Sequence, residues 1–162
     1  MKDKIIDETI KSLQAEGLRF SVDTLAERLK ISKKTVYKYF PNKEALALAT
    51  YEKYYDAAND KISELVAAND QMSASELLYI YYEAKRMVRR EIFNKYKLND
   101  VIRSYTSKQN DILWERLASA LFAGLSDEES AAVRIIIDGA FEKLCKGQSS
   151  PEYVIERLMK LI

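Results

Sequence analysis

Histidine is absent from the 162-residue chain, and cysteine occurs only once, as Cys145. Without histidine, the chain lacks the side chain that most often serves as a general base or metal ligand near neutral pH. One cysteine can neither form an intrachain disulfide nor build a thiolate zinc site. No glycine-rich phosphate loop or nucleophile elbow is present. We therefore expect a protein that is not an enzyme and holds no metal or cofactor, although carboxylates that only the fold brings together remain an open route to catalysis.

Glycine and proline are also scarce, with four and two residues respectively. Long stretches without either residue, rich in leucine, alanine, lysine and glutamate, favour helices, so the sequence predicts an all-α protein. No apolar run approaches the roughly 20 residues that are needed to cross a bilayer, so no membrane partner is expected. The first seven residues are charged and lack the apolar segment of a signal peptide, which predicts a cytoplasmic protein.

The segment 20–46 has the pattern of two short helices joined by a turn. Ser21 and Ser32 are each placed to cap a helix, because a serine hydroxyl can accept a hydrogen bond from a free N–H of the first turn. Apolar residues then recur at helical spacing, and Val36 and Phe40 continue this pattern in the second helix. The proline that follows Phe40 disfavours helical geometry there, so the second helix is expected to end at that point.

The second of these helices has a cationic outer face. Its outward residues are Lys33, Lys34, Thr35, Tyr37 and Lys38. In a DNA major groove, lysine can donate to guanine acceptors and apolar atoms can touch a thymine methyl. Neighbouring lysines alone are usually only a solvated surface. Here, however, residues 19–46 hold seven lysines or arginines against three acidic residues, a net charge of +4, which leaves −3 for the rest of the chain. This concentration of charge predicts double-stranded DNA as a partner.

The same segment resembles the DNA-binding signature of the TetR family. The resemblance lies in Leu25-Ala26, Ile31-Ser32, Thr35–Phe40 and Asn42–Leu46. It implies an all-helical homodimer whose N-terminal three-helix domain binds DNA. It also implies base or phosphate contacts by the five outward residues, phosphate contacts by Tyr39 and Lys43, and a DNA-backbone contact by Thr24. One departure is Lys30, which stands where the family usually has glycine, and a left-handed conformation there would cost about 1–2 kcal/mol.

Helical spacing of apolar residues continues through the rest of the chain, and we expect about nine helices in all. Residues 1–46 are interpreted as the helix-turn-helix domain, and residues 47–162 as an antiparallel helical domain for ligand sensing and dimerisation. Outside the segment 20–46, we expect one helix over 3–16 and a single long helix over 42–68. A further helix is expected to begin at Ser73 after a loop, followed by one or two short helices in 92–105 and one helix from about 107 to 122. The last two helices are expected to begin at Ser126 and Ser150.

The last two expected helices are too apolar for the outer surface of a small monomer. In the resembled family, the equivalent pair joins its symmetry mate in a four-helix bundle. The resemblance therefore implies a dimer interface formed by Val133, Ile136, Ile137, Ala140, Phe141, Leu144, Val154, Leu158 and Leu161. The alternative interpretation is that these residues complete the core of the monomer.

Nine of the eleven tyrosines lie outside the segment 20–46. Because tyrosine combines a large apolar face with a hydroxyl, it suits either the wall of a ligand pocket or a hydrogen-bonded core. The resemblance places the helices of four aromatic residues around an effector site. The candidate ligand-binding residues are therefore Tyr55, Tyr82, Tyr105 and Trp114.

Taken together, these patterns predict a sequence-specific transcriptional regulator, a homodimeric repressor that a small-molecule effector releases from a palindromic operator. Its two reading helices would lie about 34–36 Å apart, in successive major grooves. One alternative is a helix-turn-helix activator or adaptor that is controlled by a protein partner and has no small-molecule pocket. The other is a small enzyme whose site only the fold assembles.

Overall fold

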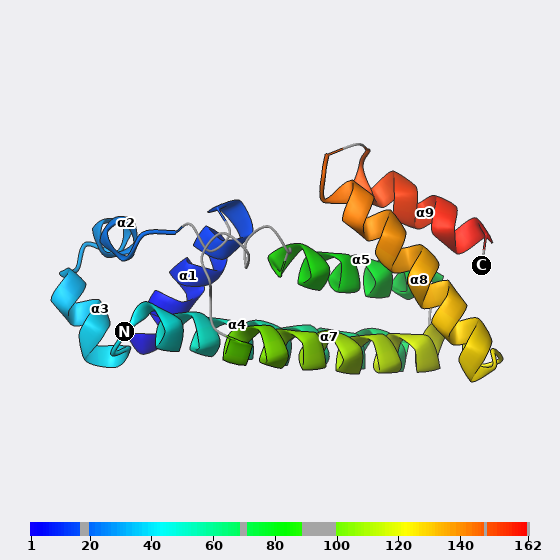
Figure 1. Ribbon diagram of the computed structural model, residues 1–162, viewed down its shortest axis with the longest axis horizontal. Coiled ribbons are helices and arrows are strands. Elements are labelled where there is room, and N and C mark those ends of the chain that lie inside the picture. The colour runs from blue at the N-terminus through cyan, green and yellow to red at the C-terminus, as the bar shows by residue number, and fades with distance from the viewer. Residues whose placement is uncertain (17–19, 69–70, 89–99, 148, 162) are drawn as a thin grey trace. The chain divides into compact units, whose positions relative to one another are not determined.

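The computed structural model describes residues 1–16, 20–68, 71–88, 100–147 and 149–161. These residues form eight helices and no strand, which confirms the all-α prediction (Figure 1). The helices are α1 (Lys2–Glu16), α2 (Val22–Arg28), α3 (Lys33–Tyr39), α4 (Lys43–Ala68), α5 (Gln71–Met87), α7 (Asp100–Leu121), α8 (Asp127–Leu144) and α9 (Pro151–Leu161). None of these helices is long and apolar enough to cross a membrane.

The chain divides into two compact units. The first comprises Met1–Ala57 and Met87–Ser107, and the second comprises Ala58–Arg86 and Lys108–Ile162. Helix α4 runs unbroken for 26 residues, as the absence of glycine and proline predicted, and contributes to both units. The domain boundary that the sequence suggests after residue 46 remains a prediction.

The first unit is built on apolar faces that α1 to α4 bury together. Their fully buried side chains include Ile5, Leu25, Val36, Leu46, Tyr51 and Tyr55. Burial of one such side chain stabilises the fold by about 1.5–3 kcal/mol. The two buried tyrosines of α4 also satisfy their hydroxyls, since Tyr51 donates to the Met87 carbonyl at 2.9 Å and Tyr55 to the Thr106 carbonyl at 3.4 Å. These bonds join α4 to chain segments that are distant in sequence.

The second unit has an aromatic core with a polar cluster at its edge. Trp114 and Phe141 pack against Tyr81, whose ring lies 5.6 Å from that of Trp114, and Tyr82 packs against Phe141. The Tyr81 hydroxyl donates to Asp138 at 2.9 Å, and Lys85 donates to the other oxygen of that carboxylate at 3.1 Å. One carboxylate of α8 therefore accepts two hydrogen bonds from α5, which fixes the two helices against each other.

Two helix boundaries differ from the sequence-based expectation. Helix α5 begins at Gln71, so Ser73 lies inside its first turn and not before it. Helix α7 begins at Asp100 and absorbs the part of 92–105 that was expected to form separate short helices, while residues 92–99 lie outside the described residues. The hydrophobic pattern missed the continuous α7 helix because two positions of its buried stripe are polar. The buried stripe consists of Ile102, Thr106, Asn110, Leu113 and Leu117.

Candidate nucleic-acid interface

Both short helices of the predicted helix-turn-helix are capped by serines, as expected. The Ser21 hydroxyl oxygen accepts a hydrogen bond from the Asp23 N–H at 3.2 Å, at the start of α2. The Ser32 hydroxyl oxygen accepts one from the Thr35 N–H at 3.0 Å, at the start of α3. A cap of this kind satisfies a donor that has no partner inside the helix and contributes about 1 kcal/mol. The sequence therefore specifies where each helix begins.

The turn between α2 and α3 has a left-handed residue at its centre. Lys30 has φ of +53°, the conformation that its place in the turn suggested. Its N–H donates to the Glu27 carbonyl at 3.0 Å, and the Ile31 N–H donates to the Ala26 carbonyl at 3.0 Å. This pair of bonds is the Schellman motif, which ends a helix by satisfying its last carbonyls and usually has glycine at the left-handed position. The turn thus forms with lysine in place of glycine.

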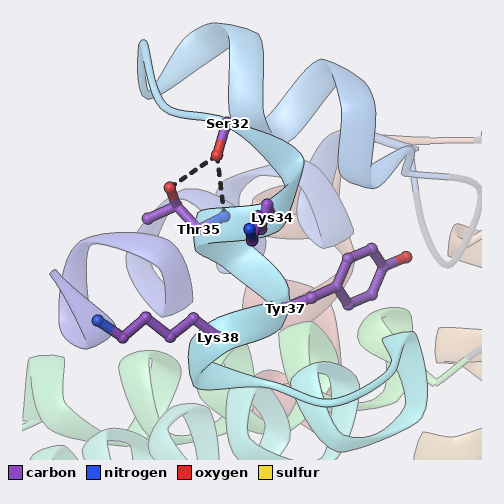
Figure 2. Close-up of a pocket in the computed structure, with 5 residues that line it drawn as sticks. All are labelled: Ser32, Lys34, Thr35, Tyr37 and Lys38. Atoms are coloured by element: carbon purple, nitrogen blue, oxygen red, sulfur yellow. Dashed lines mark hydrogen bonds between the residues drawn. The ribbon is translucent and has the colours of Figure 1, made fainter.

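Helix α3 is buried on one side and exposed on the other. Val36, in the helix, and Phe40, which ends it, are 1% and 3% exposed and point into the first unit. Four of the five outward residues line a shallow hollow of about 480 Å³, which Figure 2 shows in close-up. Tyr37 and Lys38 extend to opposite sides of the helix, with Lys34 between them (Figure 2). The hollow is lined by Ser32, Lys34, Thr35, Tyr37 and Lys38.

Some of the predicted DNA-binding side chains already have partners inside the chain. The ammonium group of Lys33 donates to the Asp23 carboxylate at 2.9 Å, and this hydrogen bond raises the pKa of Lys33. The hydroxyls of Thr35 and Ser32 lie 2.8 Å apart and share a hydrogen bond. Asp23 is a residue that the sequence reasoning missed. Its ten-residue separation from Lys33 follows no helical period, so only the turn brings the two together.

Lys43, another of the predicted DNA-binding cations, also has partners inside the chain. Its ammonium nitrogen donates to the Phe20 carbonyl at 2.7 Å and lies 4.5 Å from the centre of the Phe20 ring. Burial lowers the pKa of Lys43. The two other predicted contact residues are more accessible, since Tyr39 is exposed and Thr24 is half-buried.

Of the four candidate ligand-binding residues, three are buried and Tyr105 is half-buried, and none of them lines either of the two hollows described. Tyr55 and Tyr105 belong to the first unit, where their rings lie 6.2 Å apart. Tyr82 and Trp114 belong to the second unit and are 4% and 5% exposed. A second hollow, of about 560 Å³, opens in the second unit and includes none of the four. It is lined by Ile62, Ser63, Val66, Ala67, Glu115, Arg116 and Ser119.

The predicted dimer residues fall into three groups. Four of them are buried in the core of the protomer, namely Ile137, Phe141, Leu144 and Leu158. Three are half-buried, namely Val133, Ala140 and Val154, and the remaining two, Ile136 and Leu161, are exposed. The sequence reasoning missed two exposed apolar residues, Ile135 and Tyr153, which are 74% and 55% exposed. Apolar residues cover more than one face of α8, so the sequence did not distinguish the inward face from the outward one.

Within the described part of the chain, no three side chains of the metal-binding kinds gather into a possible metal site. The arrangement that remains is a short helix whose outward side carries lysines and hydroxyls. Donors of this kind suit phosphate oxygens and the acceptor atoms of base edges.

Comparison with known proteins agrees with this site. Residues 5–50 match the family model described as bacterial regulatory proteins, tetR family. A Bacillus subtilis (strain 168) protein, the uncharacterized HTH-type transcriptional regulator YuxN, is 41% identical over 71 residues, which cover 43% of this chain and 24% of that relative. The chain thus spans about a quarter of that relative's length. Residues 5–50 thus contain a helix-turn-helix segment that is similar to the DNA-binding part of this family.

Solved structures show the fold over nearly the whole chain. A TerR/AcrR-family transcriptional regulator from Aquifex aeolicus VF5 has a TM-score of 0.71 at 17% identity, with 98% of this chain and 95% of that chain covered. The transcriptional regulator FadR from Bacillus subtilis, solved in complex with stearoyl-CoA, has a TM-score of 0.65 at 13% identity, with 99% and 97% covered. At such identities the likeness shows a TetR-like fold.

Proposed function

We propose that the chain is a sequence-specific DNA-binding transcriptional regulator that reads its operator with α3. The observation that carries this proposal is that α3 is buried on one side only, with Val36 packed inward and Lys34, Tyr37 and Lys38 outward around one hollow. A helix of seven residues is about 10 Å long and fits a major groove about 12 Å wide. The TetR-family match over residues 5–50 supports the same conclusion.

Within this proposal, the contacts divide by chemistry. Lys34, Tyr37 and Lys38 line the hollow and are the candidates for reading base edges, with the Thr35 hydroxyl beside them. Lys33 is a further candidate for reading base edges, provided that its ammonium group leaves the Asp23 carboxylate and contacts DNA instead. Tyr39, Lys43 and Thr24 remain the candidates for phosphate contacts, which fix position but carry no sequence information.

A selection from a pool of random duplex DNA tests the proposal directly. Wild-type protein is expected to enrich a roughly palindromic sequence. Tyr37→Ala should change the enriched sequence, because Tyr37 lies on the outward side of α3. Tyr79→Ala is the matched control, since Tyr79 is 38% exposed against 39% for Tyr37 but lies on α5. Failure of the wild type to enrich any sequence, or an identical motif from Tyr37→Ala, would contradict the proposal.

We further propose that the regulator is a homodimer joined through α8 and α9. Four large apolar side chains of these helices are more than half exposed, namely Ile135, Ile136, Tyr153 and Leu161. Their burial against a second copy removes apolar area from water, which is the main favourable term in association. Sedimentation velocity of an Ile135→Glu, Ile136→Glu double variant should show monomers, and its operator affinity should fall because each monomer engages one half-site. A dimeric double variant would exclude this interface.

Release by a small-molecule effector is the mechanism that we propose for control. The FadR structure with stearoyl-CoA makes fatty acyl-CoA the first class to test, with the aromatic core of the second unit as its candidate site. A protein partner is the second candidate controller, and it is favoured by the burial of Tyr55, Tyr82 and Trp114 against the chain itself. Stearoyl-CoA added to a preformed operator complex should lower fluorescence anisotropy to that of free DNA. No change across several chain lengths would favour the protein partner.

A further inference from the structure

One stretch of α8 turns charged side chains inward and isoleucines outward. Arg134 and Asp138 face the rest of the second unit, and their side chains are only 29% and 30% exposed. Ile135 and Ile136 lie between them in sequence and are 74% and 59% exposed. Isoleucine is usually among the most buried residues, and arginine and aspartate are usually outside. Apolar burial alone therefore does not explain how this part of α8 is oriented.

The two inward charges bind side chains of two other helices. Asp138 accepts hydrogen bonds from the Tyr81 hydroxyl at 2.9 Å and from the Lys85 ammonium group at 3.1 Å, both on α5. Arg134 donates to the Asp111 carboxylate on α7, and its Nε lies 3.8 Å from the Asp138 carboxylate. These five side chains form the α8 polar cluster, which joins α8 to α5 and α7.

The contacts of the α8 polar cluster require one rotation of α8 about its own axis. Successive residues of a helix are about 100° apart, so a rotation by one residue would turn Arg134 and Asp138 away from their partners. It would also exchange the fully buried Ile137 for another isoleucine of the same size, and the gain from burying the two is equal. Phe141 anchors the C-terminal half of α8, and the α8 polar cluster anchors the half that holds the isoleucines.

We propose that Arg134 and Asp138 are positioning residues, which set the rotation of α8 and thereby select the isoleucines that a second copy of the chain contacts. This inference rests on the homodimer of the proposed function. Partly buried charges add little to stability, because their desolvation offsets most of their attraction. They are directional, however, because a hydrogen bond is lost when its donor turns away from its acceptor. The α8 polar cluster thus contributes orientation, and the exposed isoleucines contribute the apolar contact.

An apolar triple variant tests the inference, namely Tyr81→Phe, Arg134→Met, Asp138→Met. It removes the donor and the acceptor of the buried hydrogen bond together, so no buried hydroxyl is left without an acceptor. The two cluster residues that stay, Lys85 and Asp111, have side chains that are 29% and 53% exposed and reach water.

The matched control makes similar changes where no other helix is bound. It consists of Tyr79→Phe, Lys61→Met, Glu64→Met. Tyr79 is 38% exposed, and Lys61 and Glu64 form an exposed ion pair within α4. All three residues belong to the second unit, as the α8 polar cluster does.

The first measurement compares association with stability. Sedimentation velocity over a range of concentrations gives the dimer dissociation constant, and circular dichroism at a concentration where monomers dominate gives Tm. The triple variant should raise the dissociation constant at least about tenfold, the effect of one misplaced contact at an interface. Its Tm should change by less than about 3 °C, and the control should change neither quantity. A lower Tm with an unchanged dissociation constant would overturn the inference, because the cluster would then only stabilise the fold.

Thiol labelling of the monomer separates this inference from the proposed dimer. Cys145→Ser removes the one native thiol, and Ile136→Cys or Ile137→Cys then supplies a single new one. With the cluster intact, the Ile136→Cys protein should react at least about tenfold faster than the Ile137→Cys protein, because only Ile136 is exposed. In the triple variant, the ratio of the two rates should fall toward one.

An unchanged ratio of labelling rates would mean that Arg134 and Asp138 do not set the rotation of α8. If the ratio falls but the wild-type protein stays monomeric at every concentration, the two residues do position α8 and the proposed dimer fails.

Discussion

Replacement of Lys30 by glycine should stabilise the protein. Lys30 adopts φ of +53° in the turn between α2 and α3, and its side chain is exposed. A left-handed conformation costs a residue with a Cβ atom roughly 1–2 kcal/mol, and glycine escapes this cost. Against this, glycine increases the conformational entropy of the unfolded chain, and this lowers the gain in stability by about 0.4–1 kcal/mol. The expected net gain in the free energy of unfolding is therefore about 0.5–1 kcal/mol.

Urea denaturation followed by circular dichroism measures this gain. The midpoint should rise while the m-value stays constant, because the surface exposed on unfolding does not change. For a chain of this size, the gain corresponds to a rise of roughly 1–4 °C in Tm. Protein concentration must be held fixed, since association would add to the apparent stability. Operator preference should not change, because both Schellman bonds are made by the backbone.

The same substitution in a helix provides the control. Lys11 lies in the middle of α1, and Lys11→Gly should cost about 1 kcal/mol, the helix-propensity penalty of glycine. The two lysine-to-glycine changes should thus have opposite signs. If Lys30→Gly destabilises as much as Lys11→Gly does, the turn does not carry the strain that its φ angle implies.

Three further changes test other parts of the structure. Gly147 has φ of +77° with nothing within 4 Å of an added Cβ, so Gly147→Ala should lower the free energy of unfolding by about 1 kcal/mol from backbone strain alone, as urea titration would show. Asp23→Asn frees Lys33 and should tighten binding to every duplex while it steepens the salt slope by up to about 0.9; an unchanged slope would mean that Lys33 does not reach DNA. Tyr81→Phe removes the hydrogen bond to Asp138 and should cost about 1.5–3 kcal/mol in thermal unfolding, whereas a loss below 0.5 kcal/mol would show that solvent replaces it.

Local chemistry explains why the N-terminal elements were predictable. Ser21 and Ser32 cap α2 and α3 through hydroxyls that act on N–H groups two and three residues away. The left-handed turn at Lys30 follows from its place at the end of one helix and just before the cap of the next. Such interactions involve residues close in sequence, so their pattern is visible before any tertiary contact forms.

Elements whose inward side is set by distant neighbours were harder to predict. Helix α7 carries the polar residue Thr106 in its buried stripe, where the hydroxyl donates a hydrogen bond to the Ile102 carbonyl at 2.9 Å. A search for apolar residues at helical spacing therefore does not detect this position as buried. On α8, Ile136 and Ile137 are adjacent and equally apolar, yet the first is 59% exposed and the second is fully buried. Only the packing of α8 within the second unit determines which of them points inward.

The sequence by itself determined the all-α architecture, the helix-turn-helix and the concentration of positive charge on α3, because capping, helical period and charge are properties of short segments. The tertiary structure alone decided the partners of the cations. Lys33 meets Asp23 and Lys43 meets Phe20, across 10 and 23 residues of chain. No periodicity encodes such separations, since they arise only when folded helices bring a donor and an acceptor within about 3 Å of each other.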